Sequence, residues 1–213
     1  MLRNSSFAEI MILLPALILA LTVHELCHGL SAYALGDSTA KRDGRLTFNP
    51  IRHIDPIGML FILVVGFGWA KPVMVNPANL KNPKVDMALI AFCGPLSNFV
   101  MAFLALLIAY PLFFFAPNLP MFVSSAIITF SQINIVLGIF NMIPFPPLDG
   151  SKVIAGLLPE SVYRSLPPVG GLGMVLLLVM MFTGLTARIL FPMIDTVFSA
   201  FMTAVISIYS VIF

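Results

Sequence analysis

Charged residues are scarce in this chain of 213 residues, because Asp, Glu, Lys and Arg make up only 9% of the sequence while 60% is hydrophobic. Soluble domains carry about 25% charged residues, so the composition excludes an ordinary soluble protein. The only cysteines, Cys27 and Cys93, are too few for a disulfide framework. With a mean hydropathy of +1.04, the chain is expected to be an integral membrane protein that contacts lipids and no nucleic acid.

The few basic residues are unevenly placed. Seven of the eleven Lys and Arg residues lie between Lys41 and Lys84. Cytoplasmic loops of membrane proteins carry an excess of Lys and Arg. We therefore expect the segment 41–84 to face the cytoplasm.

Long apolar runs predict an α-helical polytopic membrane protein with about five to six transmembrane helices, each needing about 20 residues. We expect the whole of 1–213 to be one membrane-embedded domain. The sequence from Met87 to Leu148 has no charged residue, which favours two spans with a break at the proline-containing residues 116–120. The expected spans are 7–35, 87–115, 121–140, 169–187 and 189–213, the last two joined near Arg188, with a further helix restarting within the core region 87–158 at about 151–158.

The basic segment 41–84 contains an apolar run of 14 residues, Ile57–Ala70, with three glycines. This run is shorter than the roughly 20 residues that a span needs. Residues 45–48 and 72–75 alternate between apolar and polar side chains, as strands do. The pattern predicts a membrane-associated β-hairpin or re-entrant segment that lines a polar cavity.

Inside the first apolar run lie His24, Glu25 and His28. A charged residue at the centre of a membrane helix costs roughly 2.5–3.5 kcal/mol, so three ionisable groups there indicate chemistry. On a helix, positions i and i+4 lie on one face, which lets both histidines bind one metal ion. The pattern H-E-x-x-H is the metalloprotease signature, with the glutamate as general base.

A catalytic zinc takes three protein ligands, so a third is needed. Asp149 is favoured because it is the only charge between Met87 and Ser151 and ends a proline-rich stretch. His53 is the second candidate. Asp149 could instead cap the helix that follows it. Cys27, inside the motif, is a further potential ligand, although a small buried hydrophobe is the simpler interpretation.

Three other residues are candidates for supporting roles. Asn98 and Asn141 lie beside proline-containing bends, where an amide could stabilise an oxyanion or hold the substrate backbone. Interhelical hydrogen bonding is the equally plausible alternative. His53 lies in the basic segment and could be a gating residue or a spare ligand, but a surface group or a group that supports a ligand from outside is favoured.

On these residues the chain resembles the site-2 protease family of intramembrane zinc metalloproteases. The resemblance rests on residues 24–28, on Gly-Pro-Leu-Ser-Asn at 94–98, and on the stretch from 141 to 150. Residues 53–58 and 68–73 look like those of the family's compact members. These segments cover most of residues 20–155 in the expected order.

The resemblance implies that Asp149 is the third zinc ligand, Glu25 the general base and Asn141 a residue that contacts substrate. It implies one zinc ion per chain and a membrane-embedded hairpin near 45–75 that guides substrate. Family members cut transmembrane helices of other membrane proteins. The chain leaves no room for the PDZ or CBS domain that many members carry, so we expect control by a regulatory membrane partner or by substrate presentation.

The sequence therefore predicts an intramembrane zinc metalloprotease whose active site opens on the cytoplasmic side, because His24 and His28 lie toward the basic segment. An inactive zinc-binding membrane scaffold is the alternative, and a missing Glu25 would have been its signature. A metal transporter ranks last, since one would expect several intramembrane carboxylates or histidines forming a path.

Overall fold

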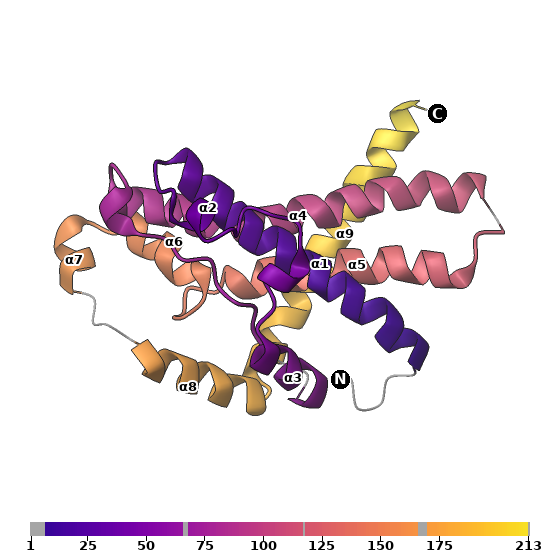
Figure 1. The fold of residues 1–213 in the computed structure, drawn as a ribbon. Helices are drawn as coiled ribbons and strands as arrows, with labels where there is room; N and C mark the ends of the chain where they lie inside the picture. Colours follow the sequence, from indigo (N-terminus) through magenta and orange to yellow (C-terminus); the bar gives the residue numbers. More distant parts are fainter. Residues whose placement is uncertain (1–6, 66–67, 117, 166–169, 213) are drawn as a thin grey trace.

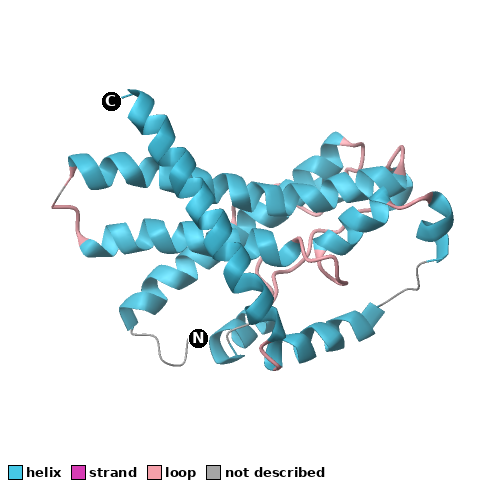
Figure 2. Ribbon diagram, turned by 180° about the vertical axis from the view of Figure 1, so that it is seen from behind, coloured by secondary structure: helices cyan, strands magenta, loops and turns pink. Residues whose placement is uncertain are grey.

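The computed structural model describes residues 7–65, 68–116, 118–165 and 170–212, which form helices joined by loops (Figures 1 and 2). The α-helices are α1 Phe7–Ala34, α2 Thr39–Arg42, α3 Pro56–Val65, α4 Pro83–Phe115, α5 Met121–Asn141, α6 Asp149–Leu157, α7 Glu160–Ser165, α8 Gly170–Phe182 and α9 Leu185–Ile212. Short 3-10 helices, η2 and η3, cover Pro50–Arg52 and Pro77–Asn79.

Four helices in the described ranges are long and apolar enough to cross a membrane, namely α1, α4, α5 and α9. This finding confirms a helical membrane protein, but the expected count of five to six spans is wrong. Helix α8 has 13 residues and is about 20 Å long, too short for a hydrocarbon core of about 30 Å. The break near Arg188 is also misplaced, because the chain turns at Gly184 with a φ of 73° and Arg188 lies inside α9.

The predicted β-hairpin is wrong as well. In the described part of 41–84, the only strand-like pairing is an isolated antiparallel bridge between Ile54 and Ala70. Most of the apolar run forms the short helix α3 instead. The backbone of residues 70–76 instead forms hydrogen bonds with the His53 carbonyl and with the side chains of Glu25, Asp37 and Arg45.

Helices α4 and α5 run side by side, and α1 crosses them (Figure 1). Small residues allow this close approach, since Ala20 and Ala102 are fully buried and a Cβ on Gly138 would meet the Phe99 ring 2.9 Å away. Membrane helices associate through such small-residue contacts because lipid offers no hydrophobic driving force between them. Helix α9 crosses α5 and α4, whereas α8 contacts α9 and lies at the edge in both views (Figures 1 and 2).

Asp37, just after α1, fastens the loop that leads into α4. Its carboxylate accepts hydrogen bonds from the Asn76 backbone at 2.7 Å, from Nδ2 of Asn79 at 2.7 Å, and from the Thr39 hydroxyl at 2.6 Å. Burial opposes ionisation of this carboxyl, but the hydrogen bonds to Thr39, Asn79 and Asn76 outweigh it and lower its pKa to about 2. The charged Asp37 therefore holds both ends of the segment 38–79.

Candidate metal centre

Two histidines of α1 and the first residue of α6 meet inside the helical core. Nε2 of His24 lies 3.2 Å from Oδ2 of Asp149, and Nε2 of His28 lies 3.1 Å from the same oxygen. The two Nε2 atoms are 3.0 Å apart. Each of the three residues is more than nine-tenths buried. Within the described ranges, these three form the one group of His, Cys, Asp and Glu residues whose ligand atoms converge in this way.

The other ring nitrogen of each histidine is held by an acceptor. Nδ1 of His28 lies 2.7 Å from the carbonyl oxygen of Ile90, which can only accept, so Nδ1 carries the proton and donates it. Nδ1 of His24 donates in the same way to Oδ1 of Asn98 at 2.7 Å. A neutral imidazole protonated at Nδ1 has its lone pair on Nε2. Both Nε2 lone pairs are thus available to a metal.

The orientation of the Asn98 amide is itself fixed by neighbours. Its Nδ2 donates to Oδ1 of Asn134 at 2.8 Å and to the Ala20 carbonyl at 3.3 Å. Nδ2 of Asn134 in turn donates to the carbonyl of Phe130 at 2.9 Å. Each residue of this relay donates to the next, from His24 on α1 through Asn98 and Asn134 to the Phe130 carbonyl on α5. Hydrogen bonds of this kind fix the tautomer and ring orientation of metal-binding histidines.

Two imidazole lone pairs and one carboxylate oxygen therefore face one another with no hydrogen between them. Such a cluster of acceptors repels itself unless a cation lies among them. Ligand atoms held about 2.1 Å from a tetrahedral zinc ion lie about 3.4 Å apart, close to the observed separations of 3.0–3.2 Å. The donor set and its spacing fit zinc, with a fourth position left for water or substrate.

Local sequence explains why these residues can meet. Gly94 of α4 lies against both imidazoles, since a Cβ there would come within 2.8 Å of Cε1 of His24 and even nearer to the His28 ring. Prolines between 144 and 147 end α5 and turn the chain so that α6 begins at Asp149. Gly150 packs against the carbonyls of Met142 and Ile143, where a side chain would not fit.

Glu25 lies next to the centre and is half-buried. Its Oε2 accepts a hydrogen bond of 2.8 Å from the backbone N–H of Val73. Nζ of Lys152 is 3.4 Å from Oδ1 of Asp149. Because Lys152 takes Oδ1 and the histidines take Oδ2, the carboxylate presents a single oxygen to the metal position.

A cavity of about 640 Å³ opens beside these residues. His24, Glu25 and Asp149 form part of its wall, and the rest is mostly apolar, contributed by α1, α3, α4, α5, α6, α8, α9 and the stretch 68–75. Ligand sites typically have volumes of about 300–1,000 Å³ with a few polar groups in an apolar lining. The cavity is large enough for a short unfolded stretch of peptide.

The structure distributes the remaining predicted residues as follows. Asn98 is fully buried among its three partners, which matches the interhelical hydrogen bond rather than the oxyanion role. Asn141 lines the cavity and donates to the Leu137 carbonyl at 3.0 Å. Asp149 makes no capping hydrogen bond, since the cap residue of α6 is Leu148.

His53 and Cys27 lie outside the converging group. His53 is 1% exposed, so the surface location considered for it is wrong. Its Nε2 lies 2.9 Å from the Thr47 carbonyl, its backbone carbonyl accepts from Lys71, and it borders a separate small pocket. Cys27 has a free thiol and is half-buried.

Sequence reasoning missed several groups that support the site. Asn134 and the Ile90 carbonyl orient the histidines, and Arg45 holds the stretch that reaches Glu25. Only Asn134 left a signal, as one of the few amides in a mostly apolar span. A backbone carbonyl leaves none, because every residue has one.

Comparisons with known proteins agree with this chemistry. The profile of "Peptidase family M50" matches residues 117–186, which include Asp149 but not the two histidines. The chain is 40% identical over 209 residues to "Putative zinc metalloprotease YwhC" of Bacillus subtilis, covering 94% of this chain and 92% of that protein. It is 26% identical over 200 residues to "Putative zinc metalloprotease Rip2" of Mycolicibacterium smegmatis, covering 91% and 75%. No solved structure matches the chain significantly.

Proposed function

The chain belongs to peptidase family M50, and we propose that it hydrolyses peptide bonds within the transmembrane segments of membrane-protein substrates. Zinc is its cofactor. The observation that carries the proposal is the convergence of His24, His28 and Asp149 beside Glu25, on the wall of a cavity between apolar helices. A metal centre buried among membrane helices is accessible to substrates that lie within the membrane.

In the proposed mechanism, His24, His28 and Asp149 would hold the zinc ion, which would supply the Lewis acidity for polarising the scissile carbonyl and lowering the pKa of water. Glu25 takes a proton from the attacking water and then donates that proton to the nitrogen of the leaving amine. The relay from Asn134 through Asn98 keeps the His24 lone pair on Nε2 throughout. Lys152 balances the charge on the outer oxygen of Asp149.

The substrate must unwind before it reaches this centre, because the amides of a helix are already hydrogen-bonded to one another. The mostly apolar cavity wall accepts the side chains of such a stretch. Asn141, whose amide borders the cavity, offers a polar contact to its exposed backbone. We place the cavity opening and the basic residues 41–84 on the cytoplasmic side, as the distribution of Lys and Arg favours.

The alternative of an inactive zinc-binding scaffold is not favoured. Glu25 is present and adjacent to the ligands, and its carboxylate lines the same cavity. A zinc-binding scaffold would need the three metal ligands but not Glu25.

The test pairs metal analysis with cleavage. Wild type, Asp149→Ala, Glu25→Gln and the control Asp195→Asn are purified, and zinc per chain is measured by elemental mass spectrometry. Each is then reconstituted in liposomes with single-span peptides that carry helix-weakening residues. Asp195 is a suitable control because it is an exposed carboxylate on α9, outside the converging group.

We expect about one zinc per chain in wild type, Glu25→Gln and Asp195→Asn, and loss of zinc in Asp149→Ala. Cleavage should disappear in Glu25→Gln and persist in Asp195→Asn. Cleavage by Glu25→Gln would remove Glu25 from the role of general base. If Asp149→Ala retains zinc, the third ligand is a residue other than Asp149. If the zinc-loaded wild type cuts no membrane peptide, the proposed activity is wrong.

A further inference from the structure

The stretch from Ala70 to Asn76 is bound to the rest of the protein along its backbone. The N–H of Lys71 donates to the His53 carbonyl at 2.8 Å, and that of Val73 donates to Oε2 of Glu25 at 2.8 Å. Further along, the N–H of Asn76 donates to Oδ2 of Asp37 at 2.7 Å. The middle one of these three hydrogen bonds ends on the residue proposed as general base.

Arg45 holds the same stretch through its carbonyls. Its Nη2 donates to the carbonyl of Lys71 at 2.5 Å and its Nη1 to the carbonyl of Pro72 at 3.3 Å. These two carbonyls immediately precede the N–H that contacts Glu25. A guanidinium presents its donors in a rigid fork, so one side chain fixes two successive peptide units.

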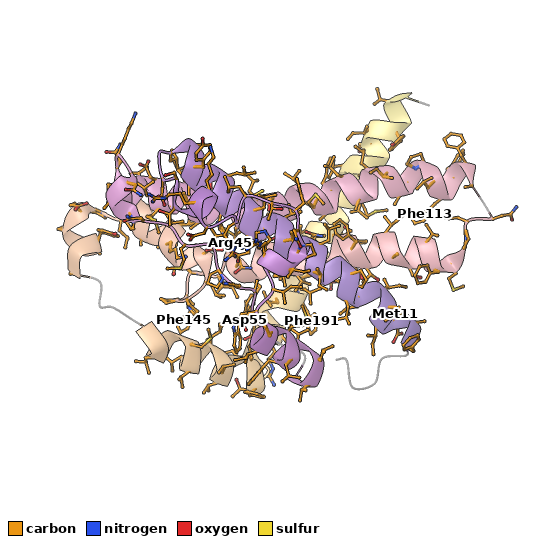
Figure 3. All side chains as sticks on the ribbon, viewed as in Figure 1. Met11, Arg45, Asp55, Phe113, Phe145 and Phe191 are labelled. Carbon is orange, nitrogen blue, oxygen red and sulfur yellow. The ribbon has the colours of Figure 1, made fainter. Side chains whose placement is uncertain are left out.

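Burying the charged side chain of Arg45 costs free energy, which indicates that this side chain has a role. It is 6% exposed, and its Nε has no hydrogen-bond partner among the described residues. Figure 3 labels it well inside the molecular outline, where α1 and the loops cross. Burial lowers the pKa of its guanidinium, and the negative charges of Glu25 and Asp43 oppose that shift. The arginine is thus buried within electrostatic range of the proposed base.

We propose that Arg45 is a positioning residue for Glu25, acting through the peptide of Val73. By clamping the carbonyls of Lys71 and Pro72, Arg45 keeps the Val73 N–H directed at Oε2 of Glu25. The carboxylate is then held in one orientation, with Oε1 as the oxygen that exchanges protons. The inference rests on the proposed function in so far as it assigns Glu25 the role of base.

A carboxylate on a flexible side chain needs such a constraint. Catalytic groups displaced by about 1 Å can lose rate by about a hundredfold. Glu25 is only half-buried and borders the cavity, so packing alone does not fix it. A backbone N–H held by a buried arginine supplies an orientation that survives when substrate fills the cavity.

The first arm of the test measures amide hydrogen exchange and does not depend on activity. Wild type, Arg45→Gln, Arg45→Lys and the control Arg42→Gln are compared over residues 70–76. Arg42 is a matched control because it is an exposed arginine three residues away whose side chain donates to the Thr39 hydroxyl at 3.3 Å, within α2. Glu25→Ala is added because it deletes the acceptor of the Val73 N–H.

We expect slow exchange at Val73 in wild type and Arg42→Gln, and exchange at least tenfold faster in Arg45→Gln and Glu25→Ala. Arg45→Lys should lie between, since an ammonium on a flexible stem cannot reproduce the fork. Rapid exchange at Val73 in wild type, or equal rates in wild type and Arg45→Gln, would overturn the clamp.

The second arm measures kcat and KM on the zinc-loaded proteins with a membrane-embedded peptide. Arg45→Gln should lose about tenfold to a hundredfold in kcat, with KM and zinc content unchanged and partial recovery in Arg45→Lys. Val73→Pro, which removes the donor N–H, should reproduce the kcat loss. If kcat is unchanged or higher once the clamp is loosened, Arg45 does not position the base.

The two proposals fail differently. If wild type cuts no membrane peptide, the proposed function fails, while the exchange arm still decides whether Arg45 holds the Val73 N–H on Glu25.

Discussion

Helices α1, α4 and α5 are packed far more closely than α9, the fourth candidate span. In the most apolar 18-residue window of each helix, 33% of the residues of α1 and 28% of those of α4 and α5 are buried, against 11% for α9. The three closely packed helices contribute the histidines and the relay that orients them. Helices α8 and α9 contribute apolar cavity wall, including Leu177 and Leu190.

The first region, helices α1, α4 and α5, and the second region, helices α8 and α9, also differ in how their buried polar groups are hydrogen-bonded. In the first region Asn98, Asn134 and Ser131 are fully buried and hydrogen-bonded across helices. In the second, the Thr186 hydroxyl is buried with no hydrogen-bond partner among the described residues. In a membrane, where apolar contact between helices gains little over lipid, small residues and polar contacts decide which helices hold together. The metal centre is built where both occur.

The largest expected effect comes from filling the space at Gly94. Gly94→Ala places a methyl group within 2.8 Å of the His24 ring and closer still to His28, so α1 and α4 must separate or the imidazoles must rotate away from Asp149. We expect loss of most of the bound zinc, measured by elemental analysis of purified protein. The same substitution in the second region, Gly171→Ala, meets no described atom within 4 Å and should leave zinc content unchanged.

This pair of variants tests whether the two regions respond differently to one methyl group. Full zinc content in Gly94→Ala would show that the histidine pair can shift without losing the metal. Zinc loss in Gly171→Ala would show that α8 supports the centre as much as α4 does.

A smaller effect is expected from breaking the amide relay. Asn134→Leu removes the acceptor that fixes the Asn98 amide, so the amide can turn its NH₂ toward the Nδ1–H of His24 and disfavour the metal-binding tautomer. Loss of such an outer hydrogen bond costs about 10–100-fold in metal affinity. Competition with a zinc chelator measures the change. Thr203→Val is the matched control, because its hydroxyl bonds only to the Ser199 carbonyl of its own helix, and we expect wild-type affinity from it.

Much of the centre could be predicted from the sequence because its ligands are rare residues in apolar surroundings. The i, i+4 spacing places His24 and His28 on one face of a helix, and the isolation of Asp149 in a long uncharged stretch marks it for a special role. The groups that orient them could not be predicted in the same way. The Ile90 carbonyl and the Val73 N–H become specific only when α4 and the stretch 70–76 approach α1.

The errors in the fold prediction also have physical causes. The alternating stretch at 72–75 forms hydrogen bonds with the side chains of Glu25 and Arg45 rather than with a second strand. Alternation predicts an extended backbone and does not say what will pair with it. The C-terminal apolar run is long enough for two spans, yet Gly184 ends α8 early with a positive φ, as glycine after a helix commonly does.

The smallest effect, and one of opposite sign, is expected in the second region from Thr186→Val. The Thr186 hydroxyl is buried without a partner on the described residues, and replacing such a group by an apolar one of the same shape is neutral or stabilising. We expect an unchanged or slightly higher thermal midpoint in detergent. Asn134→Leu should lower the midpoint, because it leaves the Asn98 amide without its hydrogen-bond acceptor.

Thr186 also borders the cavity, so the KM of Thr186→Val should be measured as well. An unchanged KM would leave the contrast between a polar, ligand-holding region and an apolar wall intact. A raised KM with an unchanged midpoint would mean that substrate supplies the missing partner, and the second region would then hold a polar contact of its own.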